Sequence, residues 1–159
     1  MIRDATSADL PALTDVYNSL GVATTASYDL TEASTSDRAL WLASHTVVVA
    51  EVDGHVVGYA AHGQFRSLAG YDATRETSVY VHPEHQGRGL GRRLMQGLIE
   101  RARASGVHAL VAVIDADNVA SKALHADLGF VDCGTLPEVG RKFEHWLSVT
   151  LMVLSPLAG

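Results

Sequence analysis

A glycine-rich stretch between residues 82 and 103 is the part of the sequence best suited to bind a charged ligand. It reads HPEHQGRGLGRRLMQGLIERAR and holds four glycines and five arginines, whereas the whole chain of 159 residues carries a net charge of −6. A helix that begins directly after such a turn has backbone N–H groups without intrahelical partners and the positive end of its dipole. Glycine lets an anion come close to that backbone, so the geometry suits a pyrophosphate. A surface turn before a solvated basic helix is the alternative, and the glycines alone do not decide between the two.

The spacing of these glycines excludes two common phosphate-binding motifs. Gly87, Gly89 and Gly91 do not follow the GxGxxG spacing of dinucleotide folds, and the stretch lacks the lysine and the serine or threonine of a P-loop. What remains is QGRGLG after an alternating segment that ends in VYV. The arginines around it add charge that can grip phosphate oxygens.

The histidines and the cysteine do not predict a second reactive site. His82 and His85 are not spaced as a helical metal-binding pair, and no matching group of cysteines or histidines accompanies them, so we expect no metal. Cys133 has neither a helix start nor a paired base beside it in the sequence. We therefore expect a packed or inert thiol rather than a nucleophile.

The composition fits one globular domain that spans residues 1–159. Hydrophobic residues make up 47% of the chain and it has four prolines, which suits a real core. A pI of about 5.7 gives no uniform basic face for nucleic acid. The single cysteine excludes an internal disulfide, and the first residues lack the pattern of a signal peptide, so we expect a cytoplasmic protein. The apolar runs are shorter than the roughly 20 residues that cross a bilayer, so we expect no membrane span.

The elements that must position the glycine-rich turn alternate between strands and helices. Thr6 or Ser7 can cap a helix whose apolar residues recur every three or four positions up to Leu20. Asp53 and Gly54 tolerate positive φ and predict a tight hairpin. The expected strands are residues 46–52, 55–65, 76–81, 108–114, 130–136 and 146–154, with a short one at Ile2, and the expected helices include one through residues 40–42, one at about 91–104 and one at 118–128.

With these elements in place, the chain resembles the GNAT superfamily of acyl-coenzyme A dependent N-acyltransferases. Gln86, Gly89 and Gly91 match its signature Q/R-x-x-G-x-G/A, and the preceding strand, the segment ALHADLGF and the order of elements are similar. The resemblance implies a mixed α/β fold with a central twisted sheet flanked by helices. It also implies that acetyl-CoA rests its pyrophosphate on the turn and its pantetheine arm along the preceding strand. The implied cofactor-binding residues are Val79, Tyr80, Val81, Gly87, Arg88, Gly89, Leu90, Gly91, Arg92 and Asn118.

A narrower resemblance is to the phosphinothricin and methionine sulfoximine N-acetyltransferases. FRSLAGYDATRETSVYVHPEHQGRGLG, AVIDADNVASKALHADLGF and VGRKFEHWL carry it. Members that act on phosphinothricin typically have arginine where this chain has Leu68, whereas a branch acting on methionine sulfone, sulfoximine and some neutral L-amino acids has an apolar residue. A second departure is Ser148, where many relatives have aspartate. The resemblance implies an acceptor pocket lined by Leu68, Ala69, Gly70 and Ser78.

Two residues would move protons in such an enzyme. An ammonium ion has no lone pair with which to attack a thioester, so a base must deprotonate it, and Glu76 at the start of the predicted strand could do so directly or through water. A solvent-facing glutamate is the alternative interpretation. His125 occupies a family position often held by a tyrosine that protonates the departing thiolate, and it could do the same or only order the site. The backbone N–H near Val81 could polarise the thioester carbonyl.

The sequence therefore predicts an enzyme that moves acetyl from acetyl-CoA to the α-amino group of a small L-amino acid or analogue. Acylation of a protein N-terminus or an aminoglycoside is a second hypothesis. A catalytically silent coenzyme A sensor is a third, against which the presence of Glu76 argues. Relatives are commonly dimers and the terminal strand offers an apolar edge, so we expect a homodimer.

Overall fold

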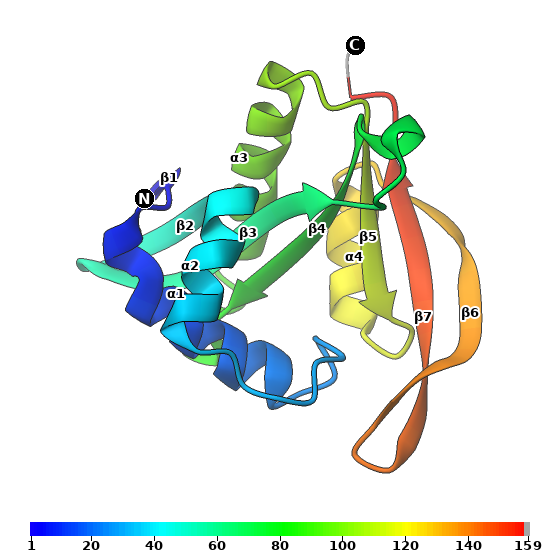
Figure 1. The fold of residues 1–159 in the computed structure, drawn as a ribbon, viewed down its shortest axis with the longest axis horizontal. Coiled ribbons are helices and arrows are strands. Elements are labelled where there is room, and N and C mark those ends of the chain that lie inside the picture. Colours follow the sequence, from blue (N-terminus) through cyan, green and yellow to red (C-terminus); the bar gives the residue numbers. More distant parts are fainter. Residues whose placement is uncertain (158–159) are drawn as a thin grey trace.

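The computed structural model describes residues 1–157, which form a seven-stranded mixed sheet in the order β1-β2-β3-β4-β5-β7-β6 (Figure 1). The strands are β1 (Ile2–Asp4), β2 (Thr46–Val52), β3 (His55–Gln64), β4 (Thr74–Val81), β5 (Ala109–Asp115), β6 (Val131–Lys142) and β7 (His145–Leu154). The helices are α1 (Leu10–Val16), α2 (Thr35–Ser44), α3 (Leu90–Ala104) and α4 (Val119–Asp127). This arrangement confirms the predicted mixed α/β fold class.

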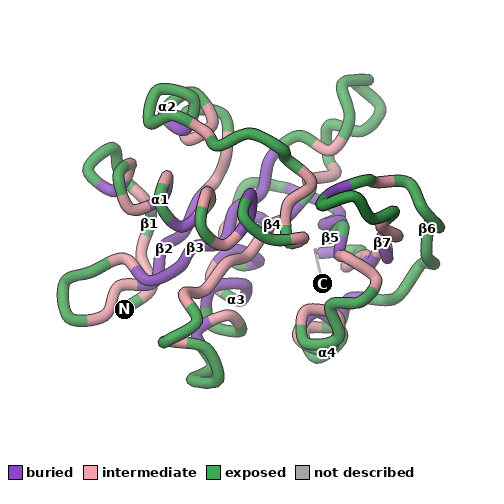
Figure 2. Tube along the Cα trace, turned by 90° about the horizontal axis from the view of Figure 1, so that it is seen from below, coloured by how far each residue is buried: buried purple, intermediate pink, exposed green. Residues whose placement is uncertain are grey.

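Helices cover both faces of the sheet, because the strands bury side chains on each. Val48 and Ala60 pack in a cluster with the buried face of α3, whereas Val49 and Tyr59 pack with α1 in a second cluster. Successive strand residues point to opposite faces, which explains the division. Figure 2 shows the buried strands between α1 and α2 on one side and α3 on the other.

The two hairpins differ in how well the sequence predicts them. Asp53 and Gly54 join β2 to β3 with φ values of 50° and 80°, as predicted. Phe143 and Glu144 join β6 to β7 with φ values of 52° and 65°, although neither residue favours positive φ. Strand β6 ends at Lys142, six residues beyond the predicted end at 136, because it continues up to this turn. The hairpin of β6 and β7 was not predicted.

The first helical region consists of three consecutive segments with different hydrogen-bonding patterns. Thr6 caps it through reciprocal hydrogen bonds with Asp9, as a capping box does. A single 3-10 turn, Ser7–Asp9, leads into α1, and a wider π-helical segment, Tyr17–Val22, follows it. The prediction of a helix capped by Thr6 or Ser7 is therefore correct in position, with Thr6 as the cap, while the π segment was not predicted.

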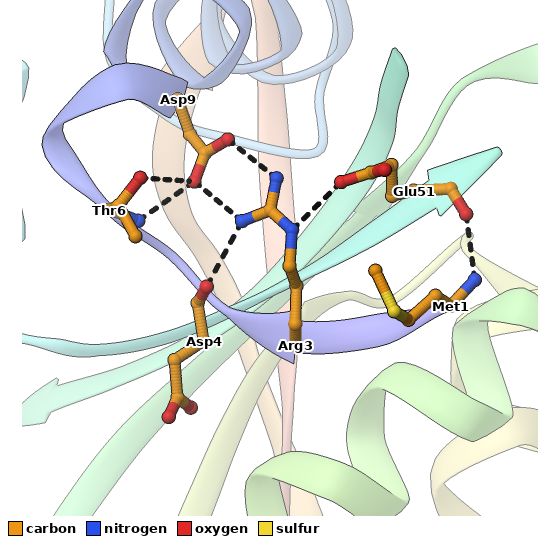
Figure 3. A network of polar contacts seen from close by, with 6 residues as sticks. All are labelled: Met1, Arg3, Asp4, Thr6, Asp9 and Glu51. Carbon is orange, nitrogen blue, oxygen red and sulfur yellow. Dashed lines mark hydrogen bonds and ion pairs between the residues drawn. The ribbon is translucent and has the colours of Figure 1, made fainter. Parts of the chain in front are cut away.

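An ion-pair network ties the start of β1 to both β2 and this first turn (Figure 3). The Arg3 guanidinium donates to both carboxylate oxygens of Asp9 at 2.9 Å and to Glu51 Oε2 at 2.8 Å. The bond from Arg3, together with the backbone N–H of Thr6, lowers the pKa of the Asp9 carboxyl to about 2. Asp9 is buried, so this pairing offsets the cost of burying its charge.

Strands β4 and β5 are parallel neighbours over only part of their length. Their register runs from Thr74 opposite Ala109 to Thr77 opposite Ala112. Beyond that point β4 continues beside β3 and β5 continues beside β7, and the two strands diverge in Figure 1. The last residues of β4 therefore have a pairing partner on one edge only.

Among residues 1–157, no helix is both long enough and apolar enough to cross a membrane.

Candidate active site

The glycine-rich turn joins β4 to α3 and exposes the start of that helix. Gly87 and Gly89 have φ values of 73° and 74°, a conformation that side chains rarely adopt, and open space surrounds both Cα atoms. Gly89 caps α3, whose first backbone bond runs from the Arg93 N–H to the Gly89 carbonyl at 3.1 Å. The Gln86 side chain donates to the Val81 carbonyl at 2.9 Å and ties the turn to β4. The first N–H groups of α3 are thus free to meet an anion.

The arginines of this turn are exposed, but one of them is already paired. Arg92 donates to Asp127 of α4 at 2.9 Å, while no ion pair joins Arg88 or Arg93 to a carboxylate in the described part of the chain. The backbone of residues 87–92 and the Arg88 side chain, which is unpaired within residues 1–157, are therefore available to a pyrophosphate. The sequence did not predict the pairing of Arg92, because Asp127 is distant along the chain.

A small opening lies where β4 and β5 diverge, and we call it the β4–β5 opening. Its volume is about 70 Å³, and its lining includes Ser78, Val79, Tyr80, Val113, Asn118 and His125. The structure thus brings together three predicted cofactor residues, Val79, Tyr80 and Asn118, with the catalytic candidate His125. Asn118 also caps α4, because its side-chain oxygen accepts from the Ser121 N–H at 3.1 Å.

His125 is buried in α4 and lines this opening. Its Nδ1 lies 2.8 Å from the Ser121 carbonyl, which can only accept, so Nδ1 carries the proton. Burial lowers the pKa of His125, although that hydrogen bond opposes the shift. A neutral ring with its proton on Nδ1 has no proton on Nε2 to give to a thiolate. Of the two predicted roles, this arrangement favours ordering of the site.

Glu76 lies on β4 at a larger cavity, which we call the aromatic cavity. This cavity has a volume of about 250 Å³, and its lining includes Tyr17, Arg38, Trp41, Tyr59, Glu76 and Tyr80. Glu76 is solvent-exposed as a residue, yet the protein around its carboxyl group desolvates it and raises its pKa. No ion pair holds this carboxylate among residues 1–157. An unpaired carboxylate of raised basicity is suited to accept a proton.

The predicted acceptor residues separate into two places. Ser78 lines both the aromatic cavity and the β4–β5 opening. Leu68, Ala69 and Gly70 are exposed in the loop between β3 and β4, and Leu68 is 69% exposed. None of these three lines either cavity. The structure therefore brings Ser78, but not the other three, to Glu76.

Arg38 is a charged residue of the aromatic cavity that was not predicted from the sequence. It is the one buried residue of α2, in a segment that otherwise looks like a polar surface helix. The one local signal is its spacing of three residues from Trp41, which places both on one helical face. The other residues around it come from distant parts of the chain.

The remaining candidates lie away from these cavities. Cys133 is exposed, so the prediction of a packed thiol is wrong, and the alternative of an inert exposed thiol stays a prediction. No group of three potential metal ligands occurs within residues 1–157. Ser148 accepts a hydrogen bond from the Glu138 N–H at 3.0 Å, which gives it a role in the pairing of β6 with β7.

The sequence and the fold both match known acetyltransferases. Residues 13–130 match the acetyltransferase (GNAT) family. The chain is 44% identical to an L-amino acid N-acyltransferase of Escherichia coli, a match that covers 96% of this chain and 92% of that protein. It is 42% identical to an L-methionine sulfoximine/L-methionine sulfone acetyltransferase of Pseudomonas paraeruginosa, over 97% of this chain and 93% of that protein. A putative acetyltransferase from Salmonella typhimurium, solved with its cofactor acetyl-CoA, superposes with a TM-score of 0.94 at 43% identity, covering 98% of this chain and 92% of that one.

The exposed start of α3 suits a pyrophosphate, and Glu76 lines the aromatic cavity, which shares Ser78 and Tyr80 with the β4–β5 opening. Together with the match over most of its length, these features show that the chain belongs to the GNAT family of acetyltransferases and transfers acyl groups.

Proposed function

We propose that this enzyme transfers the acetyl group of acetyl-CoA to the α-amino group of a small L-amino acid or analogue. One observation carries the proposal: Glu76 lies at a cavity that shares Ser78 and Tyr80 with the β4–β5 opening. An amine in the aromatic cavity would thus have a base beside it and the thioester within reach along β4. The names of the similar proteins support an amino-acid acceptor.

In the proposed reaction, Glu76 removes a proton from the acceptor's ammonium group, directly or through water. The free amine then attacks the thioester carbonyl carbon, the new C–N bond forms, and the C–S bond breaks to release the thiolate, which takes up a proton. The backbone N–H near Val81 stabilises the oxyanion, and His125 holds the wall of the opening. Most of the rate acceleration then comes from positioning, and no covalent enzyme intermediate is needed.

The groups proposed to hold acetyl-CoA follow the same path. The backbone from Gly87 to Arg92 would hold the pyrophosphate at the start of α3. The free edge of β4 at Val79–Val81 and the Asn118 side chain would hold the pantetheine arm. Because these contacts are largely to the backbone, they depend on turn conformation more than on side-chain identity.

We propose methionine sulfone and methionine sulfoximine as acceptors in preference to phosphinothricin. A similar protein is named for the first two compounds. Leu68 offers no cation to the second anionic group of phosphinothricin, which needs one when it leaves water. Leu68 lies outside the cavities of one chain, so this part of the proposal depends on how the β3–β4 loop approaches the bound acceptor.

We also propose a cytoplasmic homodimer. Five large apolar residues of β6, β7 and their turn are exposed: Val131, Leu136, Val139, Phe143 and Trp146. Apolar surface gathered at a free sheet edge is typical of an interface. An exposed free thiol at Cys133 suits a reducing compartment.

A screen of amines with acetyl-CoA tests the function. Released thiol would be measured with L-methionine sulfone, L-methionine sulfoximine, phosphinothricin, a peptide with a free N-terminus and an aminoglycoside. We expect the highest kcat/KM for the first two. A higher value for the peptide or the aminoglycoside would contradict the proposal, and binding of acetyl-CoA without any turnover would identify a silent module.

A further inference from the structure

Arg38 is a buried cation without an anionic partner. It is 4% exposed, and the ion pairs formed within residues 1–157 involve Arg3, Arg92 and Arg101 instead. Its Nη2 donates to Tyr59 Oη at 3.1 Å, while its buried Nε has no hydrogen-bond partner in the described chain. A buried charge left unpaired costs several kcal/mol. This cost calls for an explanation beyond packing.

Aromatic rings hold the guanidinium in place at the aromatic cavity. Its Cζ lies 3.5 Å from the centre of the Trp41 ring and 4.3 Å from that of Tyr17. Stacking of this kind attracts a cation and fixes the plane of the guanidinium, but ring faces do not satisfy its N–H donors. The rings therefore fix the plane of the guanidinium without satisfying all of its N–H donors.

The charges around the cavity form a simple pattern. Among its lining residues, Arg38 and Glu76 are the charged ones, and they form no ion pair with each other. Burial and the nearby charge of Arg38 lower the pKa of His45, so that ring is not a competing cation. Burial also raises the pKa of Tyr80 to about 12, which keeps the phenol neutral. One fixed cation and one fixed anion thus face the same space.

An α-amino acid carries the complementary pair of charges on adjacent groups. We propose that Arg38 binds the α-carboxylate of the acceptor and so directs its amino group toward Glu76. The inference rests on the proposed function, and it names the residue that selects amino acids over simple amines. Arginine suits the role because its planar fork matches the two oxygens of a carboxylate.

The test compares two acceptors of nearly the same shape, L-methionine sulfone and its primary carboxamide, of which only the first carries the α-carboxylate charge. Arg38→Met removes the cation and keeps an unbranched apolar side chain. We expect the wild-type enzyme to prefer the acid, and Arg38→Met to lower kcat/KM for the acid roughly 10- to 100-fold more than for the amide, as loss of a charge-assisted hydrogen bond implies. Both acceptors are measured on one preparation, so any loss of folded enzyme cancels in the ratio.

Controls separate this role from a structural one. Arg103→Met, exposed on α3 and outside both cavities, should leave the acid-to-amide ratio unchanged, and Arg38→Lys should retain part of the preference. If Arg38→Met does not fold, inhibition of the wild-type enzyme by two analogues tests the inference instead. The analogue of methionine sulfone that lacks the amino group should inhibit competitively, and its carboxamide should inhibit at least tenfold more weakly.

The possible results distinguish failure of the inference about Arg38 from failure of the proposed acetyl transfer. Equal losses for acid and amide in Arg38→Met, or equal inhibition by the two amine-free analogues, would make Arg38 a packing residue and overturn the inference while acetyl transfer stands. A wild-type enzyme that acetylates neither acceptor would overturn the proposed function, and the inference with it.

Discussion

The two ends of β4 are built in different ways. At its C-terminal end, one continuous segment, residues 81–93, presents backbone groups at the start of α3. At its N-terminal end, the aromatic cavity takes its walls from side chains on separate elements, including Tyr17, Arg38, Tyr59 and Glu76. The first region offers a ligand peptide groups that every sequence has, whereas the second offers particular side chains.

This difference assigns distinct tasks to the two regions. Backbone N–H groups at a helix start bind any suitably placed anion and tolerate changes of side chain nearby, except where positive φ demands glycine. A pocket made of separate side chains can change its preferred ligand when one of them changes. We therefore expect mutations at the glycine turn to alter cofactor affinity, and mutations at the aromatic cavity to alter turnover and acceptor choice.

The largest expected effect comes from Glu76→Gln. The amide keeps the shape but cannot accept a proton, so kcat should fall roughly 100-fold or more while the Kd for acetyl-CoA stays within a factor of about two. If Glu76 is the base, the carboxylate is the active form, so the rate should be lost as pH falls through the Glu76 pKa, which desolvation of the carboxyl group raises above its ordinary value. Steady-state rates across pH and calorimetry with acetyl-CoA measure the two quantities.

Glu100→Gln is the matched control for that variant, because Glu100 is exposed on α3 and lines neither active-site cavity. It should behave as wild type. If Glu76→Gln retained both the rate and the acid limb of the pH profile, the base would lie elsewhere and the two ends of β4 would no longer divide their tasks as proposed.

The second effect, in order of size, is on cofactor binding. Gly89→Asp adds a side chain and a negative charge where the helix start must meet a phosphate, and we expect acetyl-CoA affinity to fall roughly 10- to 100-fold. Gly106→Asp is the control, since Gly106 follows the other end of α3 with φ of 79° and equally open space. Both variants carry the same backbone strain, and calorimetry should show weaker binding only for Gly89→Asp. Equal affinities in two folded variants would remove the turn from the cofactor site.

The same contrast explains which parts could be predicted from the sequence. Gly87, Gly89 and the Asp53–Gly54 hairpin are local requirements of φ, so residue type alone reveals them. The turn at Phe143 and Glu144 has positive φ in residues that do not favour it, so tertiary packing of β6 on β7 determines it. Sequence patterns carry no sign of that packing.

The aromatic cavity shows the same limit at the level of function. Glu76 could be named as a candidate because it lies on the strand that leads into the glycine turn, and its role as the base stays a prediction. Arg38 could not, because its burial depends on Tyr17 and Tyr59, which belong to other elements and approach it only in the folded chain. A motif consists of residues that are close in sequence, whereas the residues that line a side-chain pocket are close only in the folded chain.

The smallest expected effect concerns Leu68, and it tests whether the β3–β4 loop belongs to the acceptor region. Leu68→Arg supplies a cation for the second anionic group of phosphinothricin, so the ratio of kcat/KM for phosphinothricin to that for methionine sulfone should rise. We expect a rise of about tenfold, because Leu68 is 69% exposed and solvent screens a charge pair there.

Leu40→Arg, at a position 75% exposed on α2, controls for added positive charge and should leave the ratio unchanged. If both variants shift the ratio equally, general attraction of the dianion accounts for it; if neither does, or if the wild-type chain already acetylates phosphinothricin as fast as methionine sulfone, Leu68 does not set the preference. A shift seen only in Leu68→Arg would mean that the loop reaches the acceptor during turnover, although it lies outside the cavity in a single chain.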